Sequence, residues 1–369
     1  MEYKQIRWTG QAGWVGEVMA EADVVFAFAD DAFFQTEACY SQLRGMYPQA
    51  HILGCSSSGS VLDTSISDGD VVATAIKFAR GSVRLVVADL SDTSDVGVVG
   101  ASLMEQLKAD DLHHVFVLSD GLKVNGSALA QGLNTAGVSV TGGLAGDGAR
   151  FGATWVMADG AARQGRIAAL GFYGDMRVRS GCFAGWQEFG AERVVSRSVG
   201  NVVYEIDGEP ALALYKKYLG EQAAGLPGTG LRFPLSVQAS KSGHALIRTL
   251  LAIDEAEQSL TFAGDVPQGH LCKLMRTNLD SLIDNAGMAA EAAQPDEREA
   301  VGLCLVVSCV GRRLVLGQLT EDELEIVRET LGDHTAITGF YSYGELAPFS
   351  DILQCQLHNQ TMTLTTIYE

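Results

Sequence analysis

Three glycine-containing stretches recur along the chain, and each one follows a short apolar run. They occupy residues 54–59, 142–148 and 339–345. Upstream of each stretch lies another β-rich run, and a helix-sized segment fills the gap between them. A glycine bend at the end of a strand, recurring with the same neighbours, is the signature of an internal repeat. The pattern predicts three strand–helix–strand units that each end in a glycine bend; chance similarity among short glycine runs is the alternative.

The runs around these bends define the expected fold class. The upstream strands are expected at 24–29, 115–119 and 304–308, and the helices at 31–46, 127–134 and 321–331. Consecutive strand-like runs at 70–78 and 82–89 argue against a purely parallel sheet. We therefore expect an α/β protein with mixed sheets of the α+β kind, arranged in two domains built on the repeated units.

The length of the chain supports two domains. With 369 residues and 47% hydrophobic content, the chain can bury a substantial core. Glycine and proline gather in residues 220–230, which favours a boundary there and domains spanning 1–222 and 223–369. Beyond it, the pattern predicts a helix over 271–285 and an exposed segment over 286–299, which is rich in Ala, Glu and Pro.

Charge and cysteine usage restrict the partners and the compartment. The chain carries 26 Lys plus Arg against 45 Asp plus Glu, a formal charge of -19, so nucleic acid is not an expected partner. The N-terminal residues lack a basic and apolar leader, and no apolar stretch approaches the roughly 20 residues of a membrane helix. Seven scattered cysteines fit reduced thiols, which predicts a cytoplasmic protein without membrane insertion.

The first bend carries the residue types of two kinds of catalytic or binding site. Its G-x4-G spacing followed by Ser60 resembles a phosphate loop, but the lysine that would hold the β and γ phosphates is missing. A thiol hydrolase could use Cys55 as nucleophile with a distant histidine as base. The alternative is that Cys55 fills the core while Ser56 and Ser57 satisfy the turn backbone or make a secondary ligand contact.

The histidines favour a haem more than a zinc ion. None of the seven forms a pair with the usual zinc spacing, and Cys355 and His358 would point to opposite faces of a strand. A haem needs only one axial ligand in an apolar pocket, so His358, inside the polar cluster 357–361, is the candidate haem ligand. A structural histidine that bonds neighbouring loops is the competing interpretation.

Further candidates for the same pocket surround His358 in the sequence. Tyr341, Tyr343 and Glu345 follow the third bend, and Asn359 follows His358. These side chains would either line a ligand pocket or pack and hydrogen-bond locally.

At these residues the chain resembles the FIST family of bacterial signal-transduction sensory proteins, with FIST N and FIST C domains. The most specific stretches are residues 54–59, 204–212, 340–348 and 357–364. The resemblance extends from about residue 20 to the C-terminus and implies a ligand-binding sensory protein.

Within that family, residues 246–251, 262–269 and 274–276 are similar to the nitric-oxide-sensing branch, NosP. The resemblance implies haem as cofactor, nitric oxide as signal and a separate histidine kinase as partner. It does not identify the axial haem residue, and it adds Arg276 as a secondary candidate for ligand contact.

Three hypotheses about function follow. The leading one is a cytoplasmic, non-catalytic sensor that binds haem and nitric oxide and regulates a histidine kinase in trans. The second is a sensor of a small metabolite, such as an amino acid, held by the bend N–H groups and by Tyr341 and Glu345. The third is the hydrolase that depends on Cys55.

Overall fold

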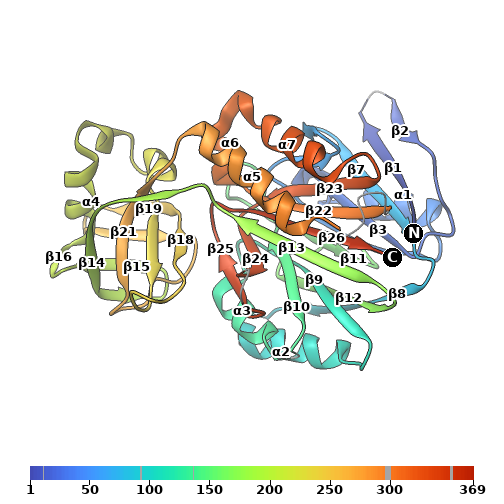
Figure 1. Ribbon diagram of the computed structural model, residues 1–369, viewed down its shortest axis with the longest axis horizontal. Helices are drawn as coiled ribbons and strands as arrows, with labels where there is room; N and C mark the ends of the chain where they lie inside the picture. The colour runs from blue at the N-terminus through green and yellow to red at the C-terminus, as the bar shows by residue number, and fades with distance from the viewer. Residues whose placement is uncertain (11, 92–93, 136, 296–300, 350–351) are drawn as a thin grey trace.

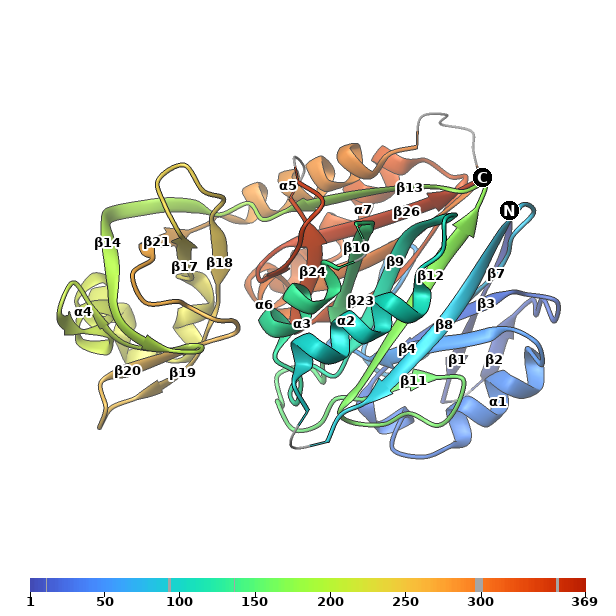
Figure 2. The ribbon, with the colours of Figure 1, turned by 90° about the horizontal axis from the view of Figure 1, so that it is seen from below.

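The computed structural model describes residues 1–10, 12–91, 94–135, 137–295, 301–349 and 352–369 (Figure 1). Three sheets of six strands each make up most of the protein, and an eight-stranded sheet forms a separate part beside them (Figures 1 and 2). Both parallel and antiparallel pairs occur, and helices cover the sheets. The predicted mixed α/β fold class is therefore confirmed.

Each six-stranded sheet contains one of the predicted repeat units. A first strand and a second strand lie parallel and adjacent, and a helix connects them on one face. The first strands are β3 (Val24–Ala29), β9 (Leu112–Ser119) and β22 (Gly302–Cys309), and the second strands are β4 (His51–Ser56), β10 (Ser139–Leu144) and β23 (Thr335–Ser342). The connecting helices are α1 (Ala38–Met46), α3 (Gly126–Leu133) and α7 (Asp322–Leu331), the last preceded by α6 (Val310–Leu316). The first helix begins later than predicted, after a short 3-10 turn at Asp31–Phe33.

Five strands of each sheet follow the same order, with three of them arranged around the two strands of the repeat unit. Antiparallel neighbours of the first strands are β7 (Val71–Lys77), β12 (Arg166–Gly174) and β26 (Met362–Tyr368), followed outward by β1 (Glu2–Thr9), β8 (Gly81–Asp89) and β13 (Arg177–Phe183). Antiparallel neighbours of the second strands are β11 (Val156–Ala158), β24 (Gly344–Pro348) and β5 (Ser60–Leu62). The sixth strand differs in place: β2 (Gly13–Gly16) lies beyond β1, whereas β25 (Cys355–His358) and β6 (Ser65–Ser67) lie beyond β24 and β5. The shared order shows that the glycine pattern marks a true threefold repeat.

The recurring glycine has a steric cause. Gly54, Gly142 and Gly339 occupy matching places in the three second strands. A Cβ atom at these positions would lie 2.0, 1.9 and 1.9 Å from a carbonyl oxygen of the adjacent first strand. Only glycine allows so close an approach of two backbones.

The three bends that follow these glycines meet in one ring of backbone hydrogen bonds. In each bond, the donor is the N–H of the residue four positions after the repeat glycine of one unit. The acceptor is the carbonyl oxygen of the residue two positions after the repeat glycine of another unit. The bonds are Ser58 N to Tyr341 O at 2.8 Å, Tyr343 N to Leu144 O at 3.0 Å and Gly146 N to Ser56 O at 3.0 Å. This set, the three-bend ring, brings the ends of all three units together.

The core lies where the three sheets face one another. Phe26 contacts Phe116 edge to face at 5.9 Å between ring centroids, and Phe28 stacks on Phe340 at 5.0 Å. These contacts join residues of different units, and all four rings are fully buried. The core therefore forms only when the three repeats pack together.

The strand-rich unit, residues 187–276, follows β13 and precedes α5 (Leu279–Ala293) (Figure 1, left). It has its own apolar core around Val203, Leu212 and Phe262. Its strands are β14 (Gln187–Val199), β15 (Val202–Ile206), β16 (Glu209–Pro210), β17 (Leu235–Gln238), β18 (Leu246–Arg248), β19 (Leu250–Asp254), β20 (Ser259–Phe262) and β21 (Leu271–Arg276). Its helices are α4 (Ala211–Leu219), η2 (Gly220–Gly225) and η3 (Gly228–Arg232).

The boundary proposed at residues 222 and 223 falls inside this strand-rich unit, within η2. Segments from the two sides of the boundary also share sheets outside the unit. For example, β13 pairs with β26 along its whole length, and β5 pairs with β23.

Two predictions for residues 271–299 are wrong. Residues 271–276 form β21, because Cys272 and Leu274 alternate into the core of the strand-rich unit, and α5 starts only at Leu279. Ala286, Ala289, Ala290 and Ala293 are buried, not exposed, because their small side chains let α5 approach the third sheet and α7 closely. The part of the predicted exposed segment from 296 onward lies outside the described residues.

Candidate functional site

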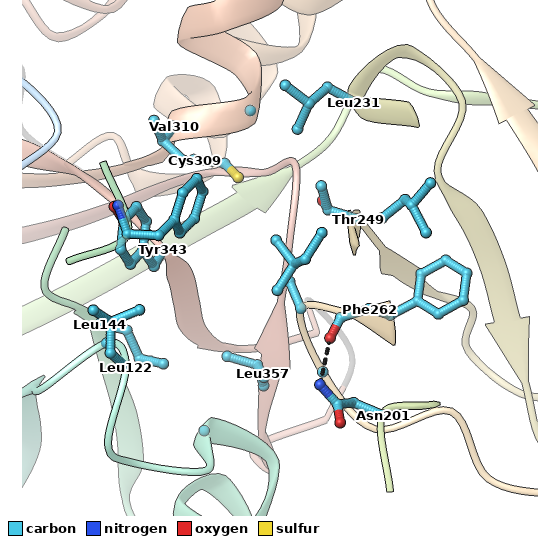
Figure 3. Close-up of a pocket in the computed structure, with 18 of the residues that line it drawn as sticks. Leu122, Leu144, Asn201, Leu231, Thr249, Phe262, Cys309, Val310, Tyr343 and Leu357 are labelled. Atoms are coloured by element: carbon cyan, nitrogen blue, oxygen red, sulfur yellow. Dashed lines mark hydrogen bonds between the residues drawn. The ribbon is translucent and has the colours of Figure 1, made fainter. Parts of the chain in front are cut away.

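A cavity of about 610 Å³ lies between the strand-rich unit and the ends of the repeat strands (Figure 3). We call it the junction cavity. Its walls come from the loop after β9, the end of β10, the start of α6, and from η3, β19 and β20 of the strand-rich unit. Each wall belongs to a different part of the sequence, so the cavity exists only in the folded protein.

Most of the wall is apolar. Leu144, Val310 and Leu357 line one side, and Leu231 and Phe262 line the side that the strand-rich unit contributes (Figure 3). A cavity of this size with an apolar wall is typical of a site for a small organic molecule.

A minority of the residues that line the junction cavity are polar, and they include the charged Lys123 and Asp265. The buried hydroxyl of Thr249 has no hydrogen-bond partner among the described residues. Asn201 donates from Nδ2 to the carbonyl oxygen of Phe262 at 2.7 Å (Figure 3). Because an unpaired buried hydroxyl is costly, Thr249 is suited to bonding a ligand.

Tyr343 forms the polar edge of the junction cavity. Its hydroxyl donates to the carboxylate of Asp147, and its ring stacks on Phe151 at 4.7 Å between centroids. Asp147 also accepts backbone hydrogen bonds from Phe151, Gly152 and Ala153 at 2.7–3.0 Å. Although burial acts in the opposite direction, the Tyr343 and backbone hydrogen bonds lower the pKa of Asp147. The charged carboxylate fixes this wall of the cavity.

Few hydrogen bonds join the strand-rich unit to the repeats across this junction. Arg248 donates from Nη1 to Leu357 O at 2.9 Å, and Gln360 donates from Nε2 to Leu231 O at 3.2 Å. The Asp265 side chain accepts a longer bond of 3.4 Å from Asn125 Nδ2. The Asp265 N–H also lies 3.3 Å from the Ser127 hydroxyl.

Of the residues predicted around His358, only Tyr343 lines the junction cavity. His358 itself is buried behind the wall, where its Nε2 lies 3.1 Å from Ala347 O and its ring meets Phe349 edge to face at 4.9 Å. Burial lowers the pKa of His358 to about 4 and keeps the ring neutral near pH 7.

The other three candidates are likewise in internal networks. The Tyr341 hydroxyl donates to Glu323 Oε1 at 2.6 Å. Glu345 accepts hydrogen bonds from Ser342 Oγ at 2.5 Å and from Thr361 Oγ1 at 2.8 Å, and burial raises its pKa to about 7. Asn359 donates to His358 O at 3.0 Å, and its own Oδ1 has no partner in the described part of the chain.

None of the secondary candidates lines the junction cavity. Cys55 is fully buried on β4, and burial raises the pKa of its thiol well above the usual value. Ser56 Oγ accepts from the Trp155 N–H at 3.0 Å, and Ser57 Oγ bonds Ser60 Oγ at 2.8 Å. Exposed Arg276 lies over the Phe189 ring, 5.6 Å from its centroid. In this structure Cys55 has no access to a substrate.

The residues present do not fit a haem held in the junction cavity by His358. No histidine or methionine lines this cavity among the described residues. Cys309 and Tyr343 line it, but burial raises the pKa of both groups, so neither is the anion that ligates iron. To reach the cavity, His358 would have to leave Ala347 and Phe349.

Several lining residues carried no signal in the sequence. Leu231 directly follows the glycine-rich stretch 220–230, and Thr249 is one hydroxyl within a strand-like run. Leucine and threonine are both common in loops and strands. Only the folded structure, in which they line the same cavity, identifies them as candidate site residues. Two stretches that carry the family resemblance, 246–251 and 262–269, do contribute residues to the wall of the junction cavity.

Comparison with known families identifies two domains along the chain. The family model described as the FIST N domain matches residues 23–209, and the FIST C domain matches residues 211–348. The chain belongs to the FIST family. FIST domains are sensory domains of signal transduction, so the predicted sensory class is confirmed at this level.

Two further comparisons add no functional assignment to this FIST protein. No curated protein sequence matches it. Among solved structures, a chorismatase crystal structure matches with 8% sequence identity and a TM-score of 0.33, over 100% of this chain and 98% of that chain. Within the described residues, no helix has both the length and the apolar character needed to span a membrane.

Proposed function

We propose that this FIST protein senses a small, largely apolar organic molecule that binds in the junction cavity. The observation that carries the proposal is the position of the cavity, whose walls come from both the strand-rich unit and the repeats. A ligand there would contact Leu231 and Phe262 on one side and Leu144 and Leu357 on the other. Thr249 would supply the polar contact that fixes its orientation.

Binding at a junction provides a way to signal. The strand-rich unit is connected to the repeats by the chain at Ala184–Trp186 and at Thr277–Asn278. A ligand that contacts both walls favours the arrangement in which they lie close, and shifts the population toward it. The change in relative position would then alter a surface that a signalling partner recognises. A histidine kinase acting in trans remains the proposed partner.

Haem, with nitric oxide as its signal, remains a second ligand to test. The resemblance to the NosP branch suggested it, and that resemblance is independent of the cavity. For that hypothesis, His358 must exchange its contact with Ala347 for iron. Titration of the purified protein with haem tests it directly: a Soret band that saturates at one haem per chain and is lost in His358→Ala supports it. A titration without a saturable band rejects it.

The junction cavity is tested with the neutral fluorescent probe N-phenyl-1-naphthylamine. We expect one saturable site in the wild-type protein and at least ~10-fold weaker binding in Leu231→Trp, because the larger ring fills the cavity. The matched control is Val98→Trp on α2 (Val96–Leu107), where the side chain is 66% exposed and does not line the cavity. Equal binding by Leu231→Trp and wild type, with both folded by circular dichroism, would reject the site.

A further inference from the structure

A second cavity, of about 320 Å³, lies on the other side of the contact between β18 and β25. We call it the side cavity. It shares only Asp265 and Leu357 with the junction cavity. Its wall combines apolar side chains, including Val237, Leu246 and Phe349, with a set of neutral hydrogen-bonding groups.

Arg248 is the positively charged group of the side cavity, Asp265 is the negatively charged one, and Arg248 is only 3% exposed. Its Nε donates to Asp265 O at 3.0 Å, and its Nη1 donates to Ile247 O at 3.1 Å and to Leu357 O at 2.9 Å. All of these acceptors are neutral backbone oxygens. Within the described part of the chain, Nη2 makes no hydrogen bond and Arg248 forms no ion pair.

The nearby Asp265 carboxylate favours the charged form of Arg248, but it forms no ion pair with the guanidinium in the described part of the chain. The other buried arginines among the described residues are ion-paired: Arg312 lies 2.7 Å from the equally buried Glu323, and Arg166 lies 2.6 Å from Asp89. A buried charge is expensive unless it is paired, because it loses the hydration that water provides. Burial lowers the pKa of Arg248 to about 10, which still leaves it charged at neutral pH.

We propose that the side cavity binds the carboxylate group of a small organic acid, with Arg248 Nη2 as the charged donor. Gln238, Gln356 and Ser127 line the same cavity and offer further hydrogen bonds to the carboxylate. The apolar side chains of the wall would hold the carbon skeleton of the acid. Asp265 also lines the cavity and repels anions, which disfavours a doubly charged phosphate relative to a singly charged carboxylate.

Benzoate is a suitable probe, because it joins one carboxylate to an apolar ring. We expect a saturable heat of binding for benzoate by calorimetry, and none for benzamide, which has the same shape without the charge. Inorganic phosphate at the same ionic strength should not bind. Equal binding of benzoate and benzamide, binding of phosphate in place of benzoate, or no binding of benzoate would each overturn the proposal.

Two variants locate the site. Arg248→Met should abolish benzoate binding; because this change can also disturb the fold, Gln238→Glu provides a second test in which Arg248 is retained. The added negative charge in the wall should weaken benzoate binding at least ~10-fold. Gln106→Glu, on the exposed face of α2, is the matched control and should bind as wild type. Unchanged binding in folded Gln238→Glu would overturn the assignment.

The side cavity is independent of the proposed function. Leu231→Trp fills the junction cavity, and Leu231 does not line the side cavity. Benzoate should therefore bind Leu231→Trp as tightly as it binds wild type, whereas the naphthylamine probe should bind this variant more weakly. Loss of benzoate binding in that variant would place the anion in the junction cavity and overturn the proposal of a separate site.

Discussion

Arg312 Nη2 lies 2.7 Å from Glu323 Oε2, and both side chains are completely buried. Glu323 also accepts the hydroxyl hydrogen of Tyr341 at 2.6 Å, and Arg312 donates to Ala184 O at 2.6 Å. Ala184 belongs to the segment that leads into the strand-rich unit. One buried ion pair therefore joins α6 and α7 to each other. Through Tyr341 and Ala184 it also joins them to β23 and to the segment that leads into the strand-rich unit.

Removing the carboxylate of this pair should destabilise the protein strongly. Glu323→Gln leaves the buried Arg312 guanidinium without its counter-charge, which costs about 3–5 kcal/mol of unfolding free energy. The matched control is Asp175→Asn, which breaks the exposed pair between Arg80 and Asp175 and should cost less than about 1 kcal/mol. Urea unfolding of the three proteins measures both values. Similar losses in the two variants would contradict the assigned role.

The steric role of the repeat glycines can be tested with Gly339→Ala. The new Cβ would lie 1.9 Å from Val306 O, so the adjacent strands must separate, and we expect a loss of at least about 3 kcal/mol. Gly45→Ala, at an exposed position of helix α1 with no atom within 4 Å of the added Cβ, should stabilise by about 1 kcal/mol. Thermal unfolding compares the two. A Gly339→Ala protein as stable as wild type would show that the strands can adjust.

Glu345 should make stability depend on pH. Burial raises its pKa from 4.5 to about 7, so its favourable contribution is present below 4.5 and is lost as the pH rises through about 7. Glu345→Gln does not titrate. Between pH 5 and pH 8, wild type should lose up to about 3 kcal/mol relative to this variant, by urea unfolding at each pH. Parallel pH profiles for the two proteins would show that Glu345 is not the group responsible.

The cysteines should be unreactive in the native protein. All seven are free, and six are buried. Burial raises the pKa of the thiols of Cys39, Cys272 and Cys304 to about 12, so the reactive thiolate is scarce. We expect Ellman's reagent to titrate fewer than one thiol per native chain within minutes, and all seven in urea. Rapid labelling of Cys55 in the native state would revive the hydrolase hypothesis.

Residues 271–299 show where local patterns fail. The sequence Leu271–Arg276 has helix-forming residues, but it becomes a strand because its alternate residues pack in the strand-rich unit. The alanine-rich segment that follows has a weak apolar pattern, and it is buried because α7 and the third sheet pack against it. Contacts with distant elements decided both cases.

The sequence by itself determined the three repeat units, because a glycine is needed wherever Gly54, Gly142 and Gly339 bring two backbones into contact. It also determined the mixed sheets and the sensory family, through motifs that are local in the chain. Only the tertiary structure decided that the three bends meet in one ring, and that Leu231, Thr249 and Tyr343 face one cavity. The physical reason is that these relationships depend on how distant segments pack, and no local spacing encodes that packing.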